Sequence, residues 1–271
     1  DRRQRQMCIR DRDGGYILPC KLLGYIPFKE IKVTPADDQE IYVSGSTIGI
    51  YMQTEGVLVI DTGEIQNRNG ETEEPARNII RQGDYIISFN GEKISTKREL
   101  IDDISELDGS EVTLGISRKG ESIPVSVTPV KDKKGDYKLG IWVRDDTQGI
   151  GTLTYVDQNG NYGALGHGIS DIDTAQLLNI RNGALYKARI LAINKGSKGN
   201  PGELAGYICY DDRNILGTIE ANSRNGIYGQ FTGTADDAIT LKKMPAAYKQ
   251  EVKIGTCLLY TSDAADDRIS V

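Results

Sequence analysis

The chain has 271 residues, a formal net charge of −6 at pH 7 and 38% hydrophobic residues, which suits two domains that each bury a core. An acidic chain without a basic run beyond its first twelve residues gives no electrostatic basis for binding nucleic acid or anionic lipid. No stretch reaches the ~18 consecutive apolar residues that a membrane span needs.

Both ends of the chain are predicted to be non-biological additions. Residues 1–12 (DRRQRQMCIRDR) and 257–271 (CLLYTSDAADDRISV) resemble translated sequencing-adapter strings, which are set aside before fold reasoning. The natural protein is then expected to be an internal fragment. The two cysteines left, Cys20 and Cys209, are expected to be packing residues. With a single histidine in the chain, we predict no metal site and no cofactor.

After a lead-in at residues 13–40, a first domain is predicted at residues 41–131. Its strands are predicted at residues 47–52, 56–60, 84–89, 112–117 and 122–128, from their apolar, β-branched composition and turn signals. Thr96 is predicted to cap a helix that runs through Leu107, with Glu99 completing a capping box.

Several residues of this region resemble the core signature of bacterial PDZ domains, which are β-sandwiches with one main helix. They are Pro75, Ile80, Gly83, Asp84, Ile86, Asn90, Gly91 and Ile94. The resemblance implies that the helix over residues 97–107 is one wall of a peptide groove. It also implies a carboxylate-binding loop made of Ser46, Thr47, Ile48, Gly49, Ile50 and Tyr51. Backbone N–H groups of such a turn can hold a peptide C-terminus, and a free strand edge can pair with an added strand, C-terminal or internal. The alternative is a PDZ-like scaffold with a closed groove.

A charged turn at residues 131–136 is predicted to be the linker to a second domain, residues 137–256. Strands are predicted there at residues 139–143, 151–156, 162–165, 184–193, 206–210, 215–220 and 226–228. Repeated short strands with glycine at most joints are typical of a sandwich or barrel. The glycine-rich segment 195–202 lacks the spacing of a phosphate-binding loop, so we predict a loop between strands. The fold class is mainly β.

The one histidine of the chain, His167, lies in the glycine-rich segment YGALGHGISDIDT, residues 162–174. Glycines on both sides let the backbone bend tightly and present one imidazole, as a general base requires. Asp171 and Asp173 could orient this imidazole, but we favour turn residues and N-cap acceptors. For His167 itself the alternative is a purely structural turn.

Four strings in the second domain resemble the stage IV sporulation protein B (SpoIVB) serine peptidases: GTLTY (151–155), the His167 segment, KGNPGEL (198–204) and GIYG (226–229). These peptidases of endospore-forming Firmicutes belong to the chymotrypsin-like clan and carry a PDZ domain ahead of the peptidase domain. The resemblance implies an incomplete chymotrypsin-like β-barrel and places His167 on the catalytic histidine.

The same resemblance implies a cellular role. The complete protein would be a sporulation serine endopeptidase, tethered to the forespore membrane by an N-terminal helix that is missing here. It would face the space between forespore and mother cell, and would cleave a subunit of a membrane-bound processing complex to activate pro-sigma-K processing.

A serine peptidase also needs a hydroxyl nucleophile, a carboxylate and oxyanion donors. No Gly-x-Ser-Gly turn follows His167, and the family's catalytic serine and aspartate are expected to lie further along than this fragment extends. Ser223, in the string NSRNG, is the best rival nucleophile, but we favour a turn residue there. We therefore predict a catalytically incomplete fragment. The alternative function is a non-catalytic PDZ peptide-binding module with a degenerate barrel.

Overall fold

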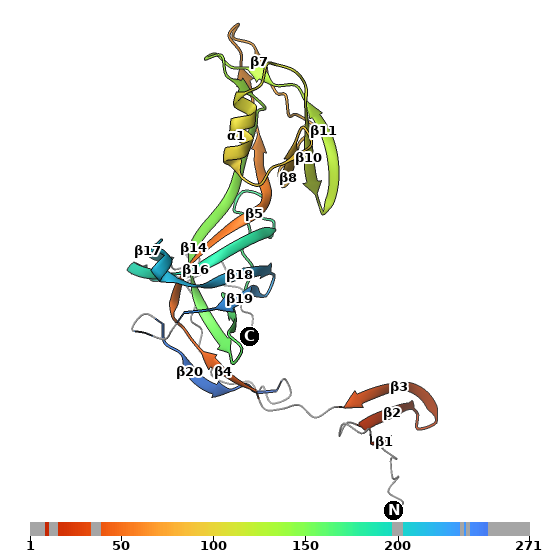
Figure 1. The fold of residues 1–271 in the computed structure, drawn as a ribbon. Helices are drawn as coiled ribbons and strands as arrows, with labels where there is room; N and C mark the ends of the chain where they lie inside the picture. The colour runs from red at the N-terminus through yellow and green to blue at the C-terminus, as the bar shows by residue number, and fades with distance from the viewer. Residues whose placement is uncertain are drawn as a thin grey trace, which may run out of the picture. The chain divides into compact units, whose positions relative to one another are not determined.

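The computed structural model describes residues 9–10, 16–33, 39–196, 203–233, 236 and 239–248 (Figure 1). The chain divides into two units, Asp1–Glu40 with Pro245–Val252 and Ile41–Met244 with Lys253–Val271. The predicted non-biological ends lie outside the described residues, except for Ile9 and Arg10, which form a short strand. The origin of these ends stays a prediction.

The first unit contains a small antiparallel sheet of strands β1 (Ile9–Arg10), β2 (Tyr16–Leu22) and β3 (Ile26–Val33). Leu23 and Gly24 join β2 to β3 at φ values of 53° and 81°, in the left-handed region that tight hairpin turns require. The lead-in predicted at residues 13–40 is therefore mostly a hairpin that pairs with itself.

The remaining elements are mainly β, as the sequence predicts. The strands are β4 (Glu40–Val43), β5 (Thr47–Thr62), β6 (Ile65–Gln66), β7 (Thr72–Glu73), β8 (Tyr85–Phe89), β9 (Glu92–Lys93), β10 (Val112–Arg118), β11 (Glu121–Val127), β12 (Val130–Lys131), β13 (Tyr137–Lys138), β14 (Ile141–Asp157), β15 (Asn161–Ala164), β16 (Ile180–Asn194), β17 (Glu203–Ile208), β18 (Ile215–Ser223), β19 (Gly226–Phe231) and β20 (Lys242–Pro245). The helical elements are the α-helix α1 (Lys97–Ser105) and the 3-10 turn η1 (Asp212–Asn214).

Local sequence signals set several of these boundaries. The predicted capping box opens α1: Thr96 Oγ1 accepts a hydrogen bond from the Glu99 N–H at 3.2 Å, and the Glu99 carboxylate accepts one from the Thr96 N–H at 3.2 Å. Asn90 and Gly91 turn the chain between β8 and β9 at φ values of 48° and 90°, and Lys119 does so between β10 and β11 at 54°. The predicted helix is thus confirmed, although it ends at Ser105 and not at Leu107. Both turns join antiparallel strands.

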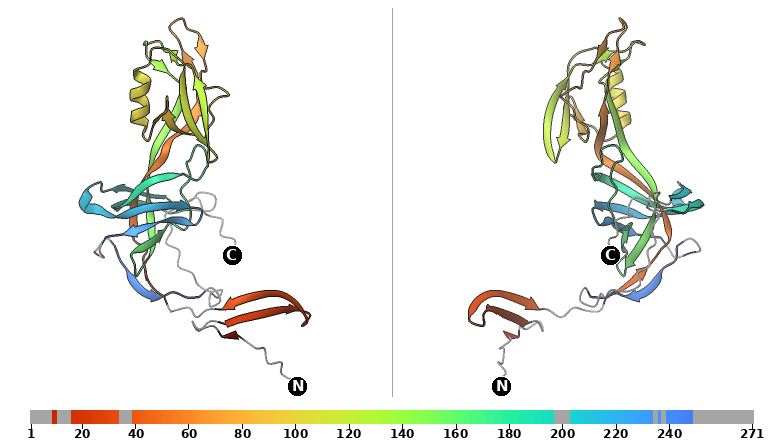
Figure 2. Two further views of the ribbon diagram at one scale, coloured as in Figure 1. Left: turned by 45° about the vertical axis from the view of Figure 1, so that its right-hand side comes forward. Right: turned by 180° about the vertical axis from the view of Figure 1, so that it is seen from behind.

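Two long strands, β5 and β14, run side by side through the second unit, and the views agree on this (Figures 1 and 2). Their antiparallel register extends from Thr47 opposite Thr152 to Thr62 opposite Ile141. The sequence predicts two short strands in place of each of them. Each pair of predicted strands is one continuous strand instead, because the residues between them keep pairing with the partner strand across local register shifts.

Gly56 marks the bend in β5. It takes a φ of 90°, and a Cβ at this position would lie 2.6 Å from the carbonyl oxygen of Ile86, so only glycine allows the approach of β8. The buried Thr54 hydroxyl lies 2.6 Å from the Gly56 carbonyl and 3.1 Å from that of Asp145. These contacts satisfy the backbone where the pairing of β5 and β14 is interrupted.

The two strands connect two hydrophobic cores. The α1 core consists of Val57, Val59, Ala76, Ile80, Ile86, Phe89, Ile94, Leu100, Val112, Leu114, Ile116, Val127 and Leu139. The ring core consists of Ile48, Ile50, Met52, Leu58, Tyr85, Leu153, Val156, Tyr162, Ala164, Leu178, Leu185, Leu216, Ile219, Ile227, Phe231 and Ile239. Residues 48–52 thus pack with the later part of the chain, whereas Leu139, Ile141 and Val143 pack with the earlier part. The charged turn at residues 131–136 is present, between β12 and β13, but it does not separate the two cores.

Around the ring core the strand pairings form a cycle, in the order β5, β16, β18, β19, β15, β14 and back to β5, and every pair is antiparallel. Register shifts interrupt all of these pairings except that of β15 with β19. The ring is therefore barrel-like without being a regular closed barrel, in agreement with the predicted incomplete barrel.

The prediction of a carboxylate-binding loop at Ser46, Thr47, Ile48, Gly49, Ile50 and Tyr51 is wrong. Thr47–Tyr51 lie inside β5, where β14 pairs with one edge and β16 with the other. Ile48 and Ile50 are buried in the ring core, and a Cβ at Gly49 would lie 2.6 Å from the Ile208 side chain. A segment with both edges paired has no free backbone N–H groups for a peptide carboxylate.

Candidate active site

The His167 loop, residues 165–179, begins where β15 ends. Leu165 and Gly166 take consecutive left-handed φ values of 71° and 88°, and the Gly166 N–H donates to the Ala164 carbonyl at 3.0 Å. This tight reversal turns the chain out of the sheet and presents the half-buried His167. The glycine before the histidine therefore has the role that the sequence predicts for it.

Gly168, after the histidine, is needed for a different reason. A Cβ at this position would lie 2.3 Å from the carbonyl oxygen of Ser223 and 2.4 Å from Leu177 Cδ1. The loop can therefore lie directly on the hairpin between β18 and β19 only with glycine here.

The ring of His167 is oriented by its own backbone neighbour. Nδ1 lies 3.0 Å from the carbonyl oxygen of Gly168, and a carbonyl can only accept a hydrogen bond, so this contact requires the proton on Nδ1. Nε2 then carries the lone pair in the neutral ring, which is the tautomer that a general base uses.

Asn222, at the end of β18, holds the His167 loop. Its side-chain oxygen accepts from the Ile169 N–H at 2.8 Å, and its Nδ2 donates to the Ile169 carbonyl at 2.8 Å and to the Leu178 carbonyl at 2.9 Å. One amide side chain thus joins both arms of the loop, two residues after the histidine and near its end. The sequence gives no local signal for this role, because Asn222 lies 53 and 44 residues from its partners.

The Ser223 hydroxyl makes hydrogen bonds within the turn between β18 and β19. Its Oγ donates to the Gly226 carbonyl at 3.2 Å and accepts from the Asn225 N–H at 3.2 Å. These are the contacts of a turn-forming serine, as the sequence interpretation favours.

Asp171 serves the loop and not the imidazole. Its Oδ1 accepts from the N–H groups of Asp173 at 3.0 Å and Thr174 at 2.9 Å. Its Oδ2 accepts from Arg144, which also pairs with the Asp173 carboxylate at 3.0 Å. Asp171 is 3% exposed, so its charge needs this cation. The favoured interpretation as a turn acceptor is confirmed, and Arg144 is a partner that the sequence does not reveal.

The His167 loop is attached to the segment at the start of β8. Gln82 Nε2 donates to the Asp173 carbonyl at 2.8 Å, and the Asn179 N–H donates to the Tyr85 hydroxyl at 3.2 Å. A Cβ at Gly83 would lie 2.4 Å from Gln176 Nε2. Two separate parts of the chain, the segment at the start of β8 and the end of β18, therefore fix the loop that carries the histidine.

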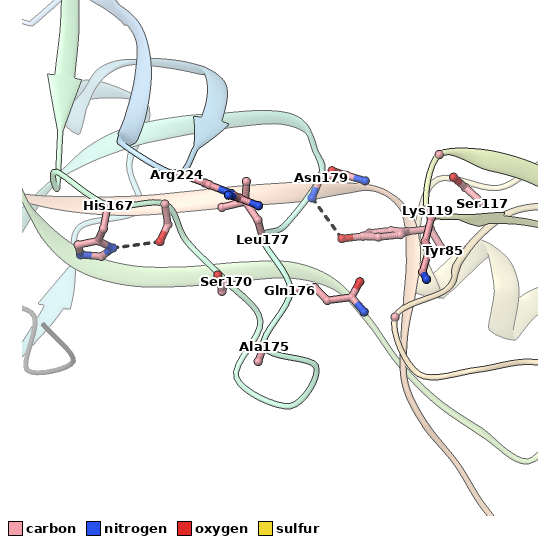
Figure 3. Close-up of a pocket in the computed structure, with 13 residues that line it drawn as sticks. Tyr85, Ser117, Lys119, His167, Ser170, Ala175, Gln176, Leu177, Asn179 and Arg224 are labelled. Carbon is pink, nitrogen blue, oxygen red and sulfur yellow. Dashed lines mark hydrogen bonds between the residues drawn. The ribbon is translucent and has the colours of Figure 1, made fainter. Parts of the chain in front are cut away.

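A cleft of about 920 Å³ lies along this loop, and Figure 3 shows the residues that line it. They are Gly83, Tyr85, Ser117, Lys119, Gly120, His167, Gly168, Ser170, Ala175, Gln176, Leu177, Asn179 and Arg224. Burial raises the pKa of Tyr85, and the nearby Asp171 and Glu55 carboxylates raise it further, so its hydroxyl stays protonated at neutral pH. The volume of the cleft lies within the range of ligand-binding pockets, and His167 is among its lining residues.

A second hollow, the α1 groove, has a volume of about 800 Å³ and lies between α1 and the start of β14. Leu100, Ile101 and Ile104 form one wall, and residues 139–143 form the other. Residues Ile141–Arg144 pair with β5 on one edge, and no strand of the described residues pairs with the other edge. The predicted helix is thus a groove wall, but the strand opposite it is β14.

Asp145 closes one end of the contact between α1 and β14. Its carboxylate accepts from the Lys97 backbone N–H at 2.8 Å and lies 3.2 Å from Lys97 Nζ. The contact between the carboxylate and the Lys97 ammonium group raises the pKa of the Lys97 side chain. The negative charge at the N-terminus of α1 also interacts favourably with the helix dipole and so stabilises the helix.

No group of three or more His, Cys, Asp and Glu side chains in the described part of the chain is arranged to hold a metal ion. Cys20 and Cys209 are free thiols. Among the residues that the structure describes, no helix is long and apolar enough to cross a bilayer.

Comparison with known families decides what this arrangement belongs to. The model of the SpoIVB peptidase S55 family matches residues 135–270, half of the chain. The chain belongs to the SpoIVB peptidase S55 family. A PDZ-domain model matches residues 46–128, so this S55 chain combines a PDZ domain with sequence of a serine peptidase family, as predicted. The S55 match includes His167 with its loop, Asn222 and the whole of β14.

Other similarities are narrower. A protein of Lactococcus lactis subsp. lactis (strain IL1403) whose name is that of a zinc metalloprotease is 38% identical over 78 residues, which are 28% of this S55 chain and 18% of that protein. The PDZ domains of the SdrC-like proteins of Listeria monocytogenes and Listeria innocua each cover 33% of the chain. The L. monocytogenes domain is 23% identical and 87% of its chain is covered, and the L. innocua domain is 25% identical and 93% of its chain is covered. The TM-score is 0.28 for both.

Asn222→Ala is expected to lower the free energy of unfolding by about 1–3 kcal/mol, because the Ile169 N–H and two carbonyls lose their partner. It should also shift the NMR signal of the one imidazole, since the His167 loop loses its attachment. The matched control is Asn225→Ala, three residues later in the same hairpin, whose side chain makes no hydrogen bond among the described residues. If both variants behaved alike, Asn222 would not be holding the loop.

Proposed function

We propose that the protein functions as a serine endopeptidase of the SpoIVB type, with His167 as the general base. The observation that carries this proposal is the presentation of a single, oriented imidazole beside an open cleft, on a loop within the S55 match. In such chemistry Nε2 takes the proton of a serine hydroxyl as the oxygen attacks the peptide carbonyl, and later gives it to the leaving amine.

The chain as it stands supplies the base without a recognised nucleophile. No Gly-x-Ser-Gly string occurs in the sequence, and the Ser223 hydroxyl is engaged in its turn. Asp171 is engaged by backbone N–H groups and Arg144, so it is not the carboxylate that orients the ring. We therefore propose that a peptidase reaction needs a serine and a carboxylate from outside the sequence given.

This chain is expected not to hydrolyse peptide bonds, because it lacks a recognised nucleophile. An enzyme that loses one member of its triad keeps only about 10³–10⁴-fold catalysis over water, and this remaining activity depends on an intact oxyanion hole. Cleavage of casein and labelling by a fluorophosphonate probe measure this. A longer chain that carries a Gly-x-Ser-Gly segment is expected to be active, and His167→Ala should abolish that activity. Labelling of Ser223 in the present chain, if lost in His167→Ala, would instead make Ser223 the nucleophile.

For the cellular role we propose signalling during sporulation. A membrane-tethered peptidase of this family would act between forespore and mother cell on a subunit of a membrane-bound complex that processes pro-sigma-K. The support for this proposal is the family match alone.

Peptide binding at the α1 groove is a second candidate function, favoured by the unpaired edge of β14 opposite α1. Leu139, Gly140 and Ile141 supply a glycine-containing turn at the start of that strand, with Gly140 at a φ of 66°. A peptide would add as a strand to residues 141–144, with its C-terminus near this turn.

A peptide with a free C-terminus and an apolar last residue is expected to bind with a change in the fluorescence of Trp142, the only tryptophan, which lines the groove. Ile101→Ser should weaken binding about tenfold, since an apolar wall residue is lost. Arg98→Ser, at an exposed α1 position outside the groove lining, is the control. Equal affinity for the C-terminally amidated peptide would show that no carboxylate is held.

A further inference from the structure

The cleft along the His167 loop is electrostatically one-sided. Its ionisable lining residues other than Tyr85 are Lys119, His167 and Arg224, and none of its 13 lining residues is Asp or Glu. The chain as a whole has a net charge of −6, so a lining with only basic groups runs against its composition.

The two permanent cations are presented by hairpin tips from different cores. Lys119 lies at the turn between β10 and β11, and Arg224 at the turn between β18 and β19. In the view of Figure 3, Arg224 and His167 are drawn toward one end of the cleft and Lys119 and Tyr85 toward the other. Both side chains are exposed, and neither forms a salt bridge or side-chain hydrogen bond with another described residue.

The tip that carries Lys119 is firmly held. The preceding residue, Arg118, binds the buried Asp84 through two hydrogen bonds of 2.8 and 2.7 Å and also donates to the Ile79 carbonyl at 3.0 Å. Asp84 is 1% exposed. Since this bidentate pair fixes the end of β10, Lys119 stays at the rim of the cleft.

Three carboxylates around the His167 loop and Tyr85 form no ion pair with these cations. Asp171 and Asp173 are paired with Arg144. Glu55 is close enough to raise the pKa of Tyr85, but it does not line the cleft. The cleft is therefore lined by two cations that have no ion-pair partner among the described residues, and by the Gln176 side chain.

We infer that this cleft binds acidic peptide segments, with carboxylate side chains of the peptide at Lys119 and Arg224 and its backbone along the His167 loop. The inference rests on the proposed function, because it names the substrate class of the same site. It also assigns the PDZ hairpin β10–β11 a direct part in binding substrate, separate from the α1 groove.

The test uses the full chain and a fluorescein-labelled decapeptide that alternates Glu with Gly and has an amidated C-terminus, so that the α1 groove has no carboxylate to hold. The comparison peptide replaces every Glu with Gln. We expect the acidic peptide to bind more tightly, to lose affinity as salt rises, and to shift the NMR signal of His167, the only histidine. Equal binding of the two peptides, or binding that leaves the His167 signal in place, would overturn the inference.

Variants locate the contacts. Lys119→Gln and Arg224→Gln should each weaken binding of the acidic peptide about two- to fivefold, as expected for solvent-exposed charge pairs. The matched controls, Lys93→Gln and Arg98→Gln, remove exposed cations that do not line the cleft and should leave the affinity unchanged. The double variant Lys119→Glu with Arg224→Glu should prefer a Lys-containing peptide. If the controls weakened binding as much as the cleft variants, the attraction would be a property of the whole surface.

Because only binding is measured, the result is independent of catalysis. A chain that binds the acidic peptide but never cleaves, even with a serine-bearing segment, would refute the proposed function alone. A longer chain that cleaves neutral and acidic peptides equally would refute the substrate class alone. Competition by millimolar inorganic phosphate as effective as that by the peptide would show a simple anion site and would also overturn the peptide assignment.

Discussion

The pairing of β5 with β14 is the constraint on which the rest of the molecule depends. Each strand contributes side chains to both hydrophobic cores, and the bend at Gly56 with the interrupted register near Asp145 lets them do so. The PDZ part is therefore not a separate module joined by a linker. Its groove strand is supplied from beyond residue 140, and its first strand begins inside the ring core.

This shared pair of strands also relates the two functional surfaces. Arg144 and Asp145 are adjacent on β14: Arg144 pairs with Asp171 in the His167 loop, and Asp145 pairs with Lys97 at the start of α1. Asn222, at the end of β18, also holds the His167 loop. The histidine thus lies on a loop that is held by hydrogen bonds from Arg144, from Asn222 and from the segment at the start of β8. These bonds limit the conformational entropy that a bound substrate would have to remove.

Local features could be predicted from the sequence, and long-range partners could not. The capping box at Thr96, the Asn90 turn and the glycines around His167 depend on residues a few positions apart, where pattern determines geometry. The PDZ resemblance places the carboxylate-binding loop at residues 46–51, which contain Ile48, Gly49 and Ile50, yet residues 139–141 (LGI) have almost the same pattern. Only the strand pairing distinguishes a buried interior segment from one at a free edge. Asn222 and Arg144 could not be predicted because their hydrogen-bond partners lie 27 residues or more away. Lys119 could not be predicted because only the fold brings it to the same cleft as His167.

The central claim, that shared strands make the two cores one structural unit, can be tested with two unique probes. Trp142 reports on the α1 groove and His167 on the ring, and the chain has one residue of each type. Urea unfolding followed by Trp142 fluorescence and by the His167 NMR signal should give a single midpoint for both, because neither core keeps a complete set of strands without the other. Two separate midpoints, at which the surroundings of one residue unfold while those of the other stay native, would contradict the account.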